Sequence, residues 1–319
     1  MYMSENILNV SSSPHVRDKW STNKIMLCVI IALLPATVFG IVNFGPRALA
    51  VVVITIASAV VAEFLYEKLL KKPVTVGDLS AVVTGLLLGL NFPSTIPFWI
   101  CILGGGFAIV VVKMLFGGLG QNFMNPALGA RCFLLLAFAG PMSSFTTDTY
   151  TSATPLALLS SDAGTVSGTY SLTDLFFGWI PGTIGETSVL CLLIGAAFLL
   201  FMGVIDLRIP GAYIITFLVV IILFGGHLTS GDLGAFILAE LCSGGLIMGA
   251  FFMATDYVTS PITPRGKIIY GIIAGVLLGV FRLFGSMAEG CSYSIIFANL
   301  LVPLIEKWTV PKPFGKGGE

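Results

Sequence analysis

Charged residues are scarce in this chain of 319 residues. Asp, Glu, Lys and Arg make up 10% of it and hydrophobic residues 56%, whereas soluble domains carry roughly 25% charged residues. A chain with so little charge suits a bilayer better than water. The 16 basic and 16 acidic residues cancel and form no basic patch with interleaved aromatics, so no nucleic-acid partner is expected.

Motifs of several enzyme classes are also missing. The sequence has no G-x-x-x-x-G-K-[ST], G-x-S-x-G or H-E-x-x-H and only two histidines, and we predict no metal site. Its six cysteines lie singly in apolar segments without C-x-x-C, which is typical of small buried side chains. A metal or iron–sulfur site would need cysteines to converge from distant helices, and spacing leaves that open. The cysteines are Cys28, Cys101, Cys132, Cys191, Cys242 and Cys291.

Long apolar runs take the place of charge. A membrane-spanning helix needs about 20 apolar residues, and such runs recur from Ile25 to Pro303. We therefore predict an all-α integral membrane protein with about ten transmembrane helices. Pro, Gly and charged residues delimit the expected spans. These are 25–42, 48–66, 79–92, 96–115, 127–140, 187–204, 211–225, 233–253, 268–285 and 291–305.

Basic residues are distributed unevenly over the predicted topology. With residues 1–24 and 306–319 as cytoplasmic tails, fourteen of the sixteen Lys and Arg fall on the cytoplasmic side, and only Arg47 and Arg282 fall outside. This asymmetry follows the positive-inside rule. It places the long loop 141–186, whose charges are all acidic, on the outer face.

Two short motifs occur once in each half of the predicted transmembrane domain, 25–305. The segment 75–81 (TVGDLSA) is similar to 229–235 (TSGDLGA), and 115–118 (LFGG) is similar to 283–286 (LFGS). Because each half has five helices, an odd number, the two copies of a motif start on opposite sides of the membrane. We predict two inverted repeats, about 25–140 and 187–305, an arrangement that recurs in transporters.

The outer loop contains a motif that suggests a bound cofactor. Residues 148–154 read DTYTSAT, which resembles the flavinylation motif D-x-x-[ST]-G-A-T of the Rnf and Nqr respiratory complexes. The matching residues are Asp148, Thr151, Ala153 and Thr154, while Ser152 replaces the usual glycine. The resemblance implies that Thr154 carries FMN as a phosphoester, attached outside the cytoplasm by a flavin transferase.

Further segments extend this resemblance over nearly the whole chain. They are 11–15 (SSSPH), 78–85 (DLSAVVTG), 117–127 (GGLGQNFMNPA) and 253–266 (MATDYVTSPITPRG). All are similar to the family that contains RnfD, a membrane component of the Rnf complex, and its relative NqrB from the Nqr sodium pump. The length fits RnfD better, because NqrB has an added N-terminal extension.

The resemblance implies a role in electron transport in the cell's inner, cytoplasmic membrane. The chain would relay electrons between ferredoxin and NAD, coupled to translocation of Na⁺ or H⁺, as a subunit that is not catalytic alone. Its partners would be the A, B, C, E and G components of the Rnf complex and the lipid bilayer. A second, non-covalent riboflavin is also implied. The alternatives are an Nqr-like quinone-reducing subunit and a flavin-free channel or transporter.

Acidic residues inside predicted helices are the remaining candidates. A charge at mid-helix costs roughly 2.5–3.5 kcal/mol to insert, so Glu240 either binds or relays a cation or is a protonated or hydrogen-bonded helix-packing group. Glu63 and Glu67 are interpreted as a cytoplasmic-end charge cluster beside Lys68. Asp78 and the equivalent Asp232 are expected to cap the helices that they precede.

Two Gly- and Pro-rich segments, 117–126 and 255–266, interrupt the apolar pattern. Irregular backbone at membrane depth is tolerated only where it is buried in protein or lines a wet cavity. These segments therefore either line a flavin or ion site or are plain cytoplasmic loops.

Overall fold

The computed structural model describes residues 20–145, 154–160, 170–225, 233–285 and 290–311, and all its regular elements are helical. The first half contains α1 (Thr22–Phe44), α2 (Pro46–Leu69), η1 (Val76–Asp78), α3 (Ser80–Leu90), α4 (Phe98–Phe107), η2 (Ala108–Met114) and α5 (Pro126–Ala137). The connecting segment contains α6 (Ala139–Met142), α7 (Pro155–Ser160) and α8 (Leu172–Phe177). The second half contains α9 (Val189–Phe201), α10 (Arg208–Phe224), α11 (Leu233–Cys242), α12 (Leu246–Met248), η4 (Gly249–Met253), α13 (Pro264–Phe284) and α14 (Cys291–Thr309).

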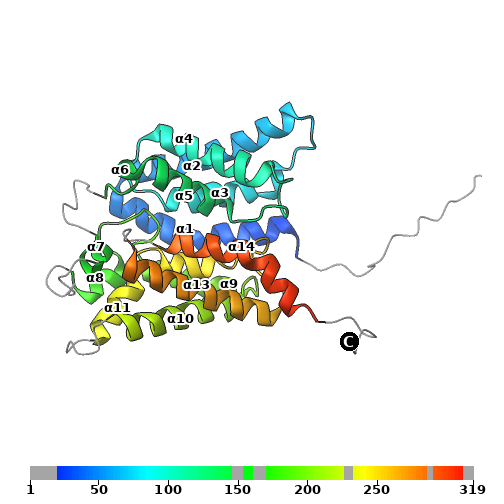
Figure 1. Cartoon of the computed structure of the whole chain (residues 1–319). Coiled ribbons are helices and arrows are strands. Elements are labelled where there is room, and N and C mark those ends of the chain that lie inside the picture. The colour runs from blue at the N-terminus through cyan, green and yellow to red at the C-terminus, as the bar shows by residue number, and fades with distance from the viewer. Residues whose placement is uncertain (1–19, 146–153, 161–169, 226–232, 286–289, 312–319) are drawn as a thin grey trace, which may run out of the picture.

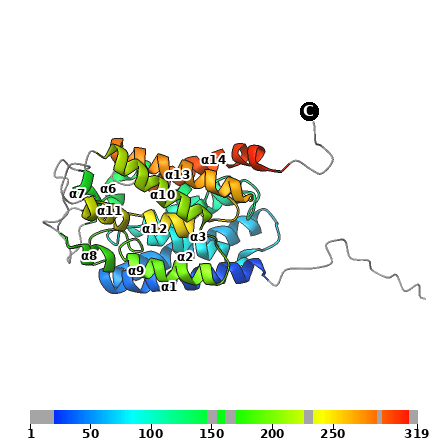
Figure 2. The ribbon, with the colours of Figure 1, turned by 90° about the horizontal axis from the view of Figure 1, so that it is seen from below.

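The long helices run side by side, so the molecule has two distinct ends (Figure 1). α1 begins and α14 finishes at one end, here called the terminal end. α7 and α8 lie at the opposite end, here called the loop end, and the view turned by 90° shows the same separation (Figure 2). An even number of crossings would place the two ends of the chain in this way.

Each of the ten predicted spans coincides with a helix or a helix pair. By length and composition, three helices in the described part of the chain can cross a membrane alone: α1, α2 and α13. The pair Phe236–Cys242 and Leu246–Met253, bent by 59°, would form a fourth, broken span. Most other segments are shorter than predicted because Gly and Pro interrupt them. Gly244, at the break in the bent pair, has a φ of 68°, which favours glycine.

The two halves meet through helices that occupy the same place in the predicted repeat. The first helix of each half contacts the other, α1 against α9, and so do the fifth helices, α5 and α14. A twofold axis between the halves would bring such pairs together. The inverted orientation of the repeats and the boundaries of the parts stay predictions.

Tryptophan side chains mark the two ends. Trp20 and Trp308 are 39% and 69% exposed at the terminal end, and Trp99 and Trp179 are 54% and 51% exposed near the loop end. Tryptophan is enriched at membrane–water interfaces. Between these two levels, α1 and α2 expose many large apolar side chains. This pattern agrees with a multi-pass membrane protein.

Close packing of α1 on α9 depends on Gly195. A Cβ atom at this position would overlap the carbonyl oxygen of Ala32. We expect Gly195→Ala to lower the free energy of unfolding by about 1–3 kcal/mol, since an overpacked contact forces the backbones apart. Gly106→Ala, in an open part of α4, is the matched control and should be neutral or slightly stabilising. Thermal unfolding in detergent compares them, and equal stabilities would contradict the expectation.

Candidate functional site

The two Gly- and Pro-rich segments lie together at one pocket. This terminal-end pocket is lined by Leu119, Asn122 and Asn125 from the first segment and by residues 255–258 from the second. The beginnings of α1 and α3 and the aromatic residues Phe251 and Phe252 complete its walls. The pocket therefore lies between the two halves. The prediction that these segments line a site, and are not plain loops, fits this arrangement.

Several polar groups line the terminal-end pocket among a majority of apolar residues. The side-chain oxygen of Asn122, a residue only 5% exposed, has no hydrogen-bond partner. Asn125 caps α5, since its side chain accepts from the N–H of Ala127 at 3.0 Å. Asp256 accepts from the hydroxyl of Thr259 at 3.1 Å. A mostly apolar pocket with a few fixed polar groups is typical of a small-molecule site.

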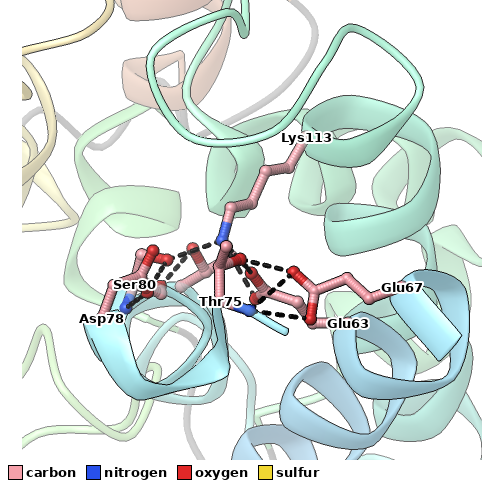
Figure 3. A network of polar contacts seen from close by, with 7 residues as sticks. Glu63, Glu67, Thr75, Asp78, Ser80 and Lys113 are labelled. Carbon is pink, nitrogen blue, oxygen red and sulfur yellow. Dashed lines mark hydrogen bonds and ion pairs between the residues drawn. The ribbon is translucent and has the colours of Figure 1, made fainter. Parts of the chain in front are cut away.

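Lys113 reaches the same pocket from η2, a π-helical turn that continues α4. Its ammonium group donates to both carboxylate oxygens of Glu63, at 2.8 and 3.0 Å, and to the hydroxyl of Ser80 at 2.6 Å (Figure 3). The hydroxyl of Ser80 donates in turn to Asp78. Glu67 accepts from the backbone N–H and the hydroxyl of Thr75.

This network corrects one prediction and confirms another. Glu63 and Glu67 are 0% and 1% exposed, so they do not form a solvated charge cluster. Lys113, at 2% exposure, neutralises Glu63 from 50 residues away in the sequence. Asp78 accepts from the N–H of Ser80 at 2.8 Å and so caps the start of α3 as predicted. Asp232 lies outside the described residues.

An ion pair near the pocket joins the α9–α10 linker to α13. The carboxylate of Asp206 lies 2.8 Å from Nζ of Lys267. Partial burial alone would raise the pKa of Asp206, but hydrogen bonds from Lys267 and from the N–H of Arg208 outweigh it and hold this pKa below the ordinary 3.8. Because the folded-state pKa is the lower one, this stabilisation is complete above pH 3.8 and is lost as the pH falls further.

Asp206→Asn tests this contribution. We expect the variant to lose less than about 1 kcal/mol at pH 7, because the pair is partly exposed to solvent. The difference from the wild type should vanish in acid, below the folded-state pKa of Asp206. Thermal unfolding at several pH values measures both effects. A difference that grows as the pH falls would contradict the assigned sign.

Thr154 lies at the loop end, directly before α7. Its hydroxyl is 3.3 Å from the N–H of Ala157, and its side chain is only partly buried. Together with Thr183, Glu186, Thr187 and others it lines a small cavity, here called the loop-end cavity. The other four residues of the predicted motif, Asp148, Thr151, Ser152 and Ala153, lie outside the described residues.

A buried ion pair lies beside the loop-end cavity. The carboxylate of Glu186 is 2.9 Å from Nη1 of Arg131, which also donates to the side-chain oxygen of Asn91. Glu186 and Arg131 are 5% and 3% exposed. Both residues are therefore buried inside the protein, although Glu186 lies in the predicted loop 141–186 and Arg131 is assigned to the cytoplasmic side, which stays a prediction. This pair ties the segment between the halves to α5.

Glu240 has a cationic partner. Nη1 of Arg282 lies 2.6 Å from its carboxylate and 2.7 Å from its backbone oxygen, and Nη2 donates to the carbonyl of Ser243 at 2.9 Å. Arg282 is 8% exposed, so it is buried in the protein, and its assignment to the outer side stays a prediction. The contact favours helix pairing for Glu240, while a role in ion coupling stays a prediction.

The sequence gives no indication that Lys113, Arg131 and Arg282 are buried, because the charge pattern predicts aqueous loops or helix ends for all three. If these three residues are left out of the count, most Lys and Arg still fall on the predicted cytoplasmic side. The cysteines are free, and all but Cys191 are buried, as predicted. Within the described ranges, no group of three or more His, Cys, Asp or Glu side chains is placed to hold a metal ion.

Comparison with known proteins agrees with these features. The family model described as NQR2, RnfD, RnfE matches residues 9–315. The chain is 49% identical to the D component of the Na⁺-translocating ferredoxin:NAD⁺ oxidoreductase complex of Acetobacterium woodii, over 98% of this chain and 97% of that protein. It is 42% identical to the proton-translocating counterpart of Clostridium ljungdahlii, with the same coverage. It is 35% identical to the D component of the ion-translocating oxidoreductase complex of Aeromonas salmonicida, over 97% and 99%.

Proposed function

The chain belongs to the NQR2, RnfD, RnfE family, and from this membership we propose that it is the D component of an ion-translocating ferredoxin:NAD⁺ oxidoreductase complex. The observation that carries the proposal is the identity of 49% and 42% to two such components over almost their entire length. Their names describe complexes that move Na⁺ and H⁺ respectively. The chain acts in electron transport as part of this assembly and is not catalytic alone.

Covalent FMN at Thr154 is part of this proposal. Two observations support a fit: the side chain is only partly buried, and it stands directly before α7 at the loop end. A side chain that is not fully buried leaves room for a flavin transferase to attach a phosphoester. Bound flavin would supply exchange of one or two electrons. The chain's contribution is to hold the attachment point at the end opposite to the start of α1 and the end of α14.

A second, non-covalent flavin is proposed for the terminal-end pocket. The oxygen of Asn122 is a buried acceptor without a partner, and Lys113, whose ammonium group is held by Glu63 and Ser80, lines the same pocket. Phe251 and Phe252 provide apolar surface for a ring. A riboflavin-like ring has an N–H group that would donate to the oxygen of Asn122. The protein would bind and orient it while excluding water.

The proposed orientation follows from the two ends of the molecule. The terminal end, with Lys68 in the last turn of α2 and Lys71 and Lys72 just after it, would face the cytoplasm under the positive-inside rule. Thr154 would then lie outside the cytoplasmic membrane, where a transferase acts. Ferredoxin and NAD would be handled through the A, B, C, E and G components of the complex.

Intact-mass measurement of the chain purified from its assembled complex tests the proposal. We expect the wild type to carry one covalent FMN, located at Thr154 by peptide mapping, and to fluoresce after denaturing electrophoresis. Thr154→Val should lose both signals while the protein is still made. Thr173→Val, which removes an exposed hydroxyl in the same connecting segment, should keep them. A wild-type chain without flavin, even after co-expression with a flavin transferase, would refute covalent attachment.

A further inference from the structure

Two residues that line the loop-end cavity have buried hydroxyl groups without partners. Thr183 and Thr187 are each 2% exposed, both line the cavity, and neither hydroxyl makes a hydrogen bond within the protein. Buried polar groups are nearly always hydrogen-bonded, so such groups indicate a missing ligand or water. The other hydroxyl of this cavity, that of Thr154, lies within reach of the N–H of Ala157.

The size of the cavity limits what it can hold. Its volume is about 30 Å³, and a single water molecule needs roughly 10–15 Å³ by a comparable measure. A ligand the size of one or two water molecules, such as a small ion, therefore matches this volume.

The groups on the cavity wall favour a cation over an anion. Glu186 lines the cavity together with the two threonines, and hydroxyl and carboxylate oxygens are the donors that hard cations prefer. Arg131 already compensates the charge of Glu186 at 2.9 Å. A monovalent cation is therefore tolerated beside this pair more easily than a divalent cation.

We propose that Thr183, Thr187 and Glu186 bind one monovalent cation of the size of Na⁺. The site lies beside the attachment point of the proposed flavin, because Thr154 lines the same cavity. A phosphoester at Thr154 adds a negative charge and strengthens cation binding. This last effect rests on the proposed function, whereas the site itself does not.

Binding of Na⁺ to the purified full-length chain tests the site. We expect ²²Na⁺ equilibrium dialysis to find one ion per wild-type chain, and NaCl to raise the melting temperature more than KCl or choline chloride at equal ionic strength. Thr183→Val combined with Thr187→Val should weaken binding at least tenfold and abolish the Na⁺-specific rise. The valine pair retains the side-chain shape and removes only unpartnered hydroxyls, so the fold should persist.

Two controls complete the test. Thr173→Val alters an exposed hydroxyl elsewhere and should bind Na⁺ as the wild type does. Thr183→Ser combined with Thr187→Ser keeps both hydroxyls and should retain binding. Equal effects of Na⁺, K⁺ and choline on the wild type, or unchanged binding in the valine pair, would overturn the proposal and leave a cavity filled by water only.

Thr154→Val separates this proposal from the flavin. The variant should bind Na⁺ with lower affinity than the flavin-bearing chain, but it should still bind. A wild-type chain that carries FMN and binds no Na⁺ would refute the cation site alone. A chain that binds Na⁺ and never carries FMN would refute the flavin proposal alone.

Discussion

Replacing Arg282 with methionine is expected to lower the free energy of unfolding by about 3–5 kcal/mol, the usual cost of removing one partner of a buried ion pair. Arg282 donates to the carboxylate and the backbone oxygen of Glu240 and to the carbonyl of Ser243. Its guanidinium also lies over the ring of Phe217 at 4.9 Å. The substitution leaves three buried acceptors without this donor. Thermal and denaturant unfolding of the purified chain measure the loss.

Variants of Glu240 distinguish structure from ion coupling. Arg282→Met combined with Glu240→Leu should recover much of the lost stability, because no unpaired charge then remains. Glu240→Gln keeps an acceptor for Arg282 and should be milder than Arg282→Met. If Glu240 only pairs α11 with α13, ion pumping by the reconstituted complex will survive Glu240→Gln. Pumping that stops while electron transfer continues would favour the coupling role instead.

Replacing Lys113 with methionine should cause a loss of similar size, about 3–5 kcal/mol. Lys113 is the cation that contacts Glu63, and Glu67 and Asp78 bring further negative charge into the same network. Without the ammonium group, the fully buried carboxylate of Glu63 must stay charged without its partner or take up a proton. The measurement is thermal unfolding of the chain in detergent.

Lys68→Met is the matched control for Lys113→Met. Lys68 is exposed near the end of α2, and its substitution should change stability by less than about 1 kcal/mol. Glu63→Gln combined with Lys113→Met should restore part of the loss, since the neutral amide needs no cation. If Lys113→Met proves as stable as Lys68→Met, the ion pair contributes nothing to folding.

The helical architecture was predictable because hydropathy acts locally. Runs of apolar residues bounded by Gly, Pro and charge determine where each helix lies, and all ten predicted segments are helical. The exact lengths were harder to predict. The bend between Cys242 and Leu246, for example, depends on how α11 and η4 pack against other helices, which a window of sequence does not contain.

The buried ion pairs were not predictable from the pattern of charges. The partners of the three pairs are 42 to 55 residues apart, and which of many charges meet is decided by the tertiary fold. A lone Lys or Arg near a helix end is usually solvated, and the charge pattern assigns Lys113 and Arg131 to the cytoplasmic side without indicating that they are buried. Glu240 is recognisable by its depth alone, but its partner is not.

Sequence motifs predict part of the candidate site, and the rest of the site has no sequence motif. The position of Thr154 and the Gly- and Pro-rich segments follow from the sequence, and the structure brings the latter together at one pocket. The unpartnered Thr183 and Thr187 have no such signal, since nothing in a Gly-Thr-Ile-Gly-Glu-Thr segment distinguishes a buried hydroxyl from an exposed one.

The π-helical turn η2 explains why Lys113 points inward. It also changes which side of the helix each later residue occupies. Side chains on a regular α-helix advance by about 100° per residue, whereas the i→i+5 bonding of a π-turn inserts one extra residue into that rotation. A helical wheel that starts at Phe98 and uses the same rotation for every residue therefore puts each residue after the turn on the wrong side of the helix. Deleting a single residue between Ala108 and Val112 would restore regular winding and swing the ammonium group away from Glu63.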